Sequence, residues 1–162
     1  MYLLDTPVVL ELRKAKAGRT DAGLATWAAG MSRQNLFLSA LSLLELENGA
    51  ARMERQDKAG AAAQRGWIAD QVMPAFEGRI LPVDAAVVRR RAQLALADTR
   101  DALLAATAIE HGLTLVTRQT ASFKGTRLKL FNPWGYTPED DGDWRQAART
   151  GPVWLKNLFV RA

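Results

Sequence analysis

The sequence contains no cysteine and only one histidine, His111, among its 162 residues. Without cysteine there are no disulfide bonds, no zinc sites built on thiolates and no cysteine nucleophile. A single histidine argues against a histidine-built metal centre and against a Ser-His-Asp triad. Chemistry in this protein must therefore come mainly from carboxylates, hydroxyls, lysines and arginines.

Long apolar runs are also missing, because no stretch of about 18 apolar residues occurs. The start lacks a basic segment followed by an apolar stretch and a small-residue cleavage site. We therefore expect no transmembrane helix, no signal peptide and no membrane partner, and we expect a cytoplasmic protein.

The composition suits one domain with a real core, or one domain with an appendage, since 48% of the residues are hydrophobic. The net charge of +5 is typical of proteins that bind nucleic acid or another polyanion. Simple solubility explains the same charge equally well, so composition alone leaves the partner open.

Short apolar runs alternate with helical patterns along most of the chain. Asp21, Ser42, Asp84 and Asp98 are expected to cap helices. The expected strands are Tyr2–Leu4, Leu36–Leu38, Ile80–Leu81, "LTLVT" (113–117) and "RLKLF" (127–131). This alternation predicts an α/β domain with a largely parallel central sheet, in which functional groups gather at the carboxyl ends of the strands.

Three acids stand near the ends of these elements. Asp5 directly follows the first strand, Glu45 lies just inside the helix after the second strand, and Asp101 lies in the first turn of an otherwise apolar helix. Brought together, they would repel one another unless protonated or bridged by a hard cation. Oxygen-only ligation suits Mg²⁺ or Mn²⁺, which can activate water and stabilise attack on a phosphodiester.

Each acid also has a purely structural explanation. Ser42 and Glu45 match a capping box, Asp101 would face the positive end of its own helix, and Asp5 could cap the helix that begins at Pro7. Spacing alone leaves both explanations open.

Several segments carry a resemblance to a known family. They are "LLDT" (3–6), "SALSLLELENGA" (39–50), "RILPVDAAVVRRRAQL" (79–94), "DALLAATAIEHGLTLVTR" (101–118) and "LFNPW" (130–134). In this order they resemble PIN-domain ribonucleases, specifically the VapC-like toxins of bacterial toxin–antitoxin pairs near the FitB branch. The first segment is a weak signal, whereas the fourth is long and specific.

The resemblance implies a three-layer fold over residues 1–135, with a parallel sheet between two layers of helices. It also implies that Asp5, Glu45 and Asp101 are metal-binding and catalytic acids. The implied activity is Mg²⁺- or Mn²⁺-dependent endonucleolytic cleavage of RNA, often tRNA or rRNA. The implied partners are RNA, a second copy of the chain and a cognate antitoxin. Operator DNA is expected to be bound only through the antitoxin.

The sequence departs from the family pattern at two places. Pro7 replaces the asparagine that usually follows "LDT", and Ser122 stands at the position of the fourth family acid, with Gln119 in place of an asparagine. A hydroxyl brings no charge, so cation binding should be weaker. A catalytically degenerate PIN domain, acting as a protein- or nucleic-acid-binding module, is therefore the alternative function. Glu47 and Asp98 are candidates for supplying the missing charge, although Glu47 should point elsewhere on its helix.

Further residues are candidate auxiliary groups. Thr6 and Thr117 adjoin the acids, with the Thr117 hydroxyl expected in the metal's outer coordination shell. Arg118 is expected either to approach phosphate or to pair with a carboxylate and hold its loop. A looser basic segment near Asp5 is a candidate RNA rim. Its residues are Arg13, Lys14, Lys16 and Arg19.

Beyond Trp134 the resemblance ends. Residues 136–162 form a predicted C-terminal extension whose last part is rich in hydrophobic side chains, and this part should dock on its own domain or on a partner. Trp27 and Trp67 are predicted to be core residues in the first place, and antitoxin-groove or dimer contacts otherwise.

Overall fold

The computed structural model describes residues 1–137, apart from the side chain of Lys16. The extension predicted over 136–162 therefore lies almost entirely outside the described residues. Within residues 1–137, none of the helices combines the length and the apolar character that crossing a membrane requires.

A five-stranded sheet forms the centre of the fold, and every neighbouring pair of strands is parallel. The strand order is β3-β2-β1-β4-β5. The strands are β1 (Tyr2–Leu4), β2 (Leu36–Ser39), β3 (Ile80–Leu81), β4 (Thr114–Val116) and β5 (Leu130–Phe131). The predicted parallel sheet is confirmed, although the strand expected over "RLKLF" is shortened to its last two residues.

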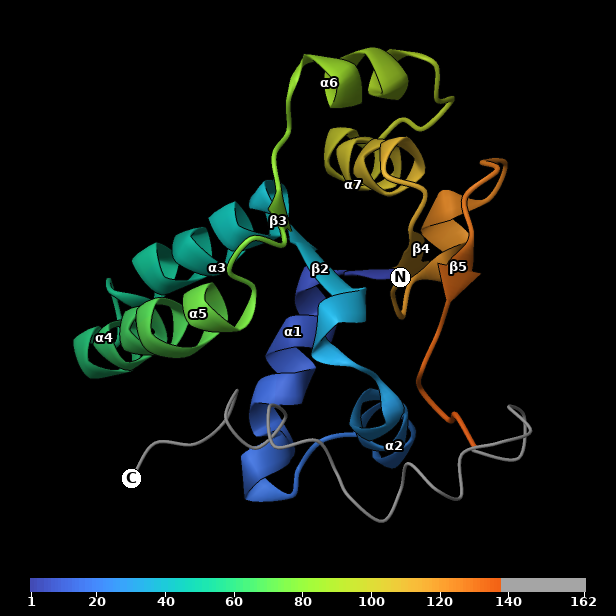
Figure 1. The fold of residues 1–162 in the computed structure, drawn as a ribbon. Coiled ribbons are helices and arrows are strands. Elements are labelled where there is room, and N and C mark those ends of the chain that lie inside the picture. The colour runs from blue at the N-terminus through green and yellow to red at the C-terminus, as the bar shows by residue number, and fades with distance from the viewer. Residues whose placement is uncertain (138–162) are drawn as a thin grey trace.

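Helices cover both faces of this sheet, as the predicted three-layer fold requires (Figure 1). The α-helices are α1 (Thr6–Arg13), α2 (Ala22–Gly30), α3 (Ala40–Met53), α4 (Lys58–Trp67), α5 (Met73–Ala75), α6 (Ala85–Ala92) and α7 (Thr99–Glu110). Short 3₁₀ turns span Lys14–Ala17, Arg33–Asn35 and Thr120–Phe123, and a π-helical turn spans Ile68–Val72. Between Lys58 and Ala75 the chain thus forms α4, the π-helical turn and α5 in succession.

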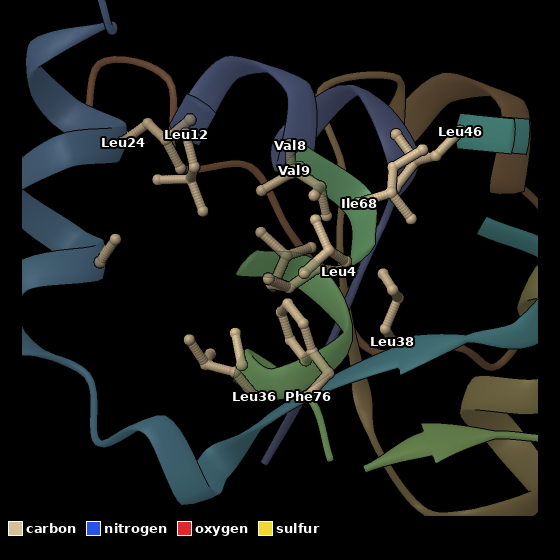
Figure 2. Packing of buried hydrophobic residues seen from close by; sticks show 14 of the residues in the cluster. Leu4, Val8, Val9, Leu12, Leu24, Leu36, Leu38, Leu46, Ile68 and Phe76 are labelled. Carbon is tan, nitrogen blue, oxygen red and sulfur yellow. The ribbon is translucent and has the colours of Figure 1, made fainter. Parts of the chain in front are cut away.

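Two hydrophobic clusters lie on opposite faces of the sheet because successive strand residues point to opposite sides. Leu3 and Leu115 pack with Leu104 of α7. Leu4 packs instead with a larger cluster that includes Val8 of α1 (Figure 2). Both β1 leucines are essentially inaccessible to solvent. The two buried leucines therefore hold β1 between the helical layers, and the residue that follows the strand has a fixed position.

Helix caps follow the sequence in most places. The side chains of Asp21, Asp84 and Asp98 accept hydrogen bonds from the backbone of α2, α6 and α7, as predicted. The cap expected at Ser42 is wrong, because β2 continues to Ser39 and α3 begins at the next residue. Ser39 is the N-cap, and the hydroxyl of Ser42 is buried inside the helix. The proposed capping box with Glu45 therefore does not form.

Gly23 on α2 marks a close approach between the helix and the chain that follows β5. A Cβ atom at this position would lie 2.4 Å from the Tyr136 nitrogen and 2.8 Å from both the Gly135 nitrogen and the Pro133 oxygen. All three are backbone atoms, so the neighbour cannot move aside cheaply. We expect Gly23→Ala to lower the free energy of unfolding by about 1–3 kcal/mol, the usual cost of overpacking. Urea denaturation measures this change.

Gly30 provides the matched control, because it lies on the same helix and a Cβ there meets no atom within 4 Å. Gly30→Ala should be neutral or stabilise by up to about 1 kcal/mol through the unfolded chain. Equal denaturation midpoints for the two variants would contradict the close approach.

Candidate active site

Asp5 occupies the point where β1 ends and α1 begins. Its backbone N–H donates to the Val116 carbonyl at 3.0 Å, which continues the sheet, while its own carbonyl accepts from the Val8 N–H at 2.9 Å, which starts the helix. Its side chain caps α1 by accepting from the Thr6 N–H at 2.8 Å. The Asp5 side chain is only 2% exposed. The structural cap foreseen from sequence is thus present, and it leaves the second carboxylate oxygen for other partners.

Thr117 follows β4, the strand beside β1, and it lies next to Asp5 because Leu4 and Val116 are paired in the sheet. The Thr117 hydroxyl donates to Asp5 Oδ2 at 2.7 Å and accepts from the Gln119 N–H at 3.1 Å. Thr117 is completely buried. The carboxylate of Asp5 is therefore held in one orientation by groups from two neighbouring strands.

Glu45 reaches the same place from α3. The next residue, Leu46, is buried in the larger hydrophobic cluster and anchors that turn of the helix. The hydroxyl of Thr6 donates to Glu45 Oε2. Thr6, predicted as an auxiliary residue, therefore links the first and second acids.

Asp101 lies in the first turn of α7. Its backbone N–H donates to Asp98 Oδ1 at 2.8 Å, so the cap of the helix fixes the start of this turn. The side chain of Asp101 is 16% exposed, and its Oδ1 accepts from Arg100 Nη1 at 2.9 Å.

Arg100 brings the three acids together. Its Nε donates to Glu45 Oε1 at 2.7 Å, and its Nη2 donates to Glu45 Oε2 at 3.0 Å and to Asp5 Oδ1. With the bond from Nη1 to Asp101, one guanidinium contacts all three carboxylates. Residues separated by more than ninety positions thus meet around one positive charge, at the carboxyl ends of β1 and β4.

The charges in this cluster stabilise one another. Burial alone would lower the pKa of Arg100, but hydrogen bonds with Glu45 and Asp5 outweigh it and raise that pKa above its usual range. Burial likewise would raise the pKa of Glu45, yet the hydrogen bonds from Arg100 and Thr6 lower it overall. Arg100 is therefore a permanent cation, and Glu45 is ionised at neutral pH.

The donor set fits a hard divalent cation in charge and in atom type, because it consists of carboxylate oxygens that already surround a cation. Within residues 1–137, however, no three acidic or histidine side chains stand close enough to share one metal ion directly. The guanidinium of Arg100 occupies the space between the acids.

A cavity of about 570 Å³ opens onto this cluster. Glu45, Arg100 and Asp101 line it, together with Arg52 of α3 and Gln119. Solvent thus reaches Glu45 and Asp101 through the cavity, whereas Asp5 is buried and does not line it.

Two predicted residues lie apart from the acids. Ser122 is exposed on the 3₁₀ turn Thr120–Phe123 and does not line the cavity. Arg118 stands over the ring of Trp134, with its guanidinium carbon 5.5 Å from the ring centre. Among the described residues no ion pair joins Arg118 to a carboxylate, and its approach to phosphate stays a prediction.

The basic segment predicted near Asp5 begins at the opposite end of α1. Asp5 precedes this eight-residue helix and Arg13 ends it, which separates them by about 12 Å along the helix axis. Arg13 stacks on Trp67 at 4.7 Å, and Lys14 pairs with Glu11 at 2.7 Å. Arg19 is exposed. Arg13 and Lys14 therefore do not border the acids, and the role of the segment in RNA binding stays a prediction.

Arg100 and Arg52 were not singled out in the sequence. Arg100 directly precedes Asp101, and Arg52 follows Glu45 by seven residues, a spacing that returns to the same face after two helical turns. Both signals were present in the sequence. Neither specifies which carboxylates a long cationic side chain will meet.

Comparison with known proteins agrees with this geometry. The sequence model of the PIN domain matches residues 2–127. The VapC ribonuclease Y4jK of Sinorhizobium fredii is 35% identical over 83% of this chain and 98% of its own length. The toxin FitB of Neisseria gonorrhoeae is 36% identical over 83% of this chain and 99% of its own length.

Solved structures give the same result. The crystal structure of FitAcB from Neisseria gonorrhoeae matches with a TM-score of 0.74 and 31% identity, over 83% of this chain and 99% of that one. FitAB bound to a DNA fragment matches with a TM-score of 0.73 and 30% identity, over 83% and 96% of the two chains. The order of the parallel strands, the acids at their carboxyl ends and these matches lead to one conclusion: the chain belongs to the PIN-domain family, among the relatives of VapC and FitB.

Proposed function

We propose that this protein is the toxin of a bacterial toxin–antitoxin pair and cleaves RNA as a Mg²⁺- or Mn²⁺-dependent endoribonuclease acting in the cytoplasm. The names of its relatives support a ribonuclease toxin, since one is a VapC ribonuclease and another is the toxin FitB. The preferred substrates in this proposal are tRNA and rRNA.

The observation that carries the proposal is the convergence of Asp5, Glu45 and Asp101 around one cation at the wall of the cavity. Three carboxylates from three distant segments cost free energy when gathered in a half-buried place. Such a cluster is typical of a site that recruits a cation for chemistry.

In the proposed reaction, each acid has a distinct task set by its surroundings. A bound divalent ion supplies charge neutralisation at the scissile phosphate and activation of water. Asp5 is the fixed ligand, because Thr117 and the start of α1 hold both of its oxygens. Glu45 and Asp101 line the cavity, so they would complete the ion site, and one of them would accept the proton of the attacking water.

The proposal includes partners. Similar solved structures include FitAcB and FitAB, the second of which is bound to a DNA fragment. We propose that this chain likewise binds a cognate antitoxin and reaches operator DNA only through it. A homodimer, an RNA-binding role for the basic segment and docking of residues 136–162 belong to the same proposal.

A second candidate function is a binding module without catalysis. Two observations favour it: Ser122 brings no carboxylate to the cluster, and Arg100 already forms ion pairs with all three acids. Such a module would bind its antitoxin without needing a divalent ion.

Metal dependence separates the two candidates. The full chain, incubated with a labelled tRNA and rRNA mixture, should cleave RNA with Mn²⁺ and lose all cleavage in excess EDTA. Restoring Mn²⁺ should restore cleavage, because the ion is bound reversibly through oxygen ligands. If the chain binds antitoxin but cleaves no RNA at any Mn²⁺ concentration, the enzyme proposal is wrong and the binding module is the function.

A further inference from the structure

Arg100 stands where a divalent ion would have to sit. Its guanidinium donates to Asp5, Glu45 and Asp101 together, and these are the acids proposed to hold the ion. The acids cannot share an ion directly in this arrangement, since no three of the described acidic or histidine side chains are close enough. Binding of an ion at this place therefore requires the guanidinium to leave.

The three acids hold the Arg100 side chain in place, whereas its own helix, α7, disfavours a cation there. Arg100 is the second residue of α7, where the positive end of the helix dipole disfavours a cation. The three carboxylates compensate for this unfavourable place. A divalent ion offsets most of their negative charge, so the attraction on the guanidinium becomes weaker and the side chain is free to withdraw.

The surroundings leave room for such a movement. The side chain of Arg100 is 27% exposed and lines the cavity of about 570 Å³. Its long flexible stem can swing into that space without moving the backbone of α7. Once it has left, the side chains of Glu45 and Asp101 have to close in on the buried Asp5 to share the ion, whereas the capped start of α7 can stay in place.

We propose that Arg100 is a built-in competitor of the divalent ion, so that the chain's own guanidinium occupies the metal site and must be displaced before the ion binds. This inference rests on the proposed function of the three acids. It makes Arg100 a positioning residue that sets the apparent metal affinity and offsets part of the negative charge of the metal-free site.

The competition predicts tighter metal binding when the guanidinium is removed. If Arg100 leaves the site open only about one-tenth of the time, the apparent Kd for the ion is raised about tenfold. Arg100→Ala should therefore bind Mn²⁺ about tenfold more tightly than the wild-type chain in isothermal titration calorimetry. If Arg100 only held the acids in place, Arg100→Ala would bind Mn²⁺ more weakly than the wild-type chain, because the acids would be less well ordered.

Arg52 supplies the matched control. It lines the same cavity and its charge also favours ionised Glu45, but only Arg100 hydrogen-bonds to all three acids. Arg52→Ala should tighten Mn²⁺ binding much less than Arg100→Ala. Equal tightening in both variants would show a general effect of charge and would overturn direct competition.

Thermal unfolding gives a second readout that does not involve cleavage. In EDTA, Arg100→Ala should unfold at a lower temperature than wild type, because three acids lose their counter-charge. Saturating Mn²⁺ should raise the unfolding temperature of the variant more than that of wild type. Arg100→Lys, which keeps a charge but cannot bridge three carboxylates, should lie between them and carries the test if the alanine variant does not fold.

The outcomes separate this inference from the proposed function. Wild-type binding of Mn²⁺ with equal or weaker binding by both Arg100 variants overturns the competition and leaves the metal site standing. No Mn²⁺ binding by wild type or by either variant overturns both. Adding Asp101→Asn to Arg100→Ala should remove the gained affinity, and its persistence would place the ion elsewhere and also overturn the inference.

Discussion

Asp101→Asn should reduce RNA cleavage by at least about 100-fold and relieve any growth arrest that the chain causes on expression. The substitution keeps the shape of the side chain but removes one of the three charges proposed to hold the ion. Losing about 3 kcal/mol of charge stabilisation in the transition state corresponds to roughly a 100-fold slower rate. Initial rates of cleavage with Mn²⁺ in excess measure the effect.

Asp98→Asn is the control for this prediction. Asp98 lies three residues earlier, caps α7 and lines the same cavity, yet Arg100 makes its described ion pairs with the other three acids. Asparagine caps helices as well as aspartate does. The control should therefore keep its fold and most of its cleavage.

Either of two results would contradict the assignment. Full cleavage by Asp101→Asn would exclude Asp101 from the reaction, and loss of cleavage in Asp98→Asn alone would make Asp98 the missing fourth acid.

Trp27→Ala should lower the free energy of unfolding by about 3–5 kcal/mol, the usual cost of truncating a buried aromatic residue. Trp27 is 2% exposed. Its ring lies 5.4 Å from that of Tyr2 and 5.3 Å from that of Phe131, so it joins α2 to β1 and β5. Because domains of this size are stable by only about 5–15 kcal/mol, the variant should be close to unfolding. Urea denaturation followed by far-ultraviolet circular dichroism measures the loss.

Trp27→Phe keeps one aromatic ring and should lose distinctly less stability than the alanine variant. This comparison also tests the first of the predicted roles of Trp27. A normal denaturation midpoint for Trp27→Ala, accompanied by loss of antitoxin binding, would make Trp27 a partner contact instead of a core residue.

Local sequence patterns predicted most of the helices and strands correctly, because interactions between residues close in sequence specify where these elements begin and end. The aspartates at positions 21, 84 and 98 accept hydrogen bonds from the first turns of their own helices, which a cap in the sequence already implies. Gly112 lies just beyond the end of α7, and its φ of 64° suits glycine at the end of a helix. The cap predicted at Ser42 was wrong because Ser39 and Ser42 both lie near the start of α3, and only the length of β2 decides which one caps the helix.

The sequence by itself determined the alternation of strands and helices, the parallel sheet and the identity of three acids at element ends, because periodicity and capping act over a few residues. Only the tertiary structure decided that Arg100 lies among these acids, that Arg118 stacks on Trp134 and that the basic segment begins at the far end of α1. A long cationic side chain can reach many partners within several ångströms of its backbone. Which partner it meets depends on how distant segments pack, and packing is a property of the whole fold.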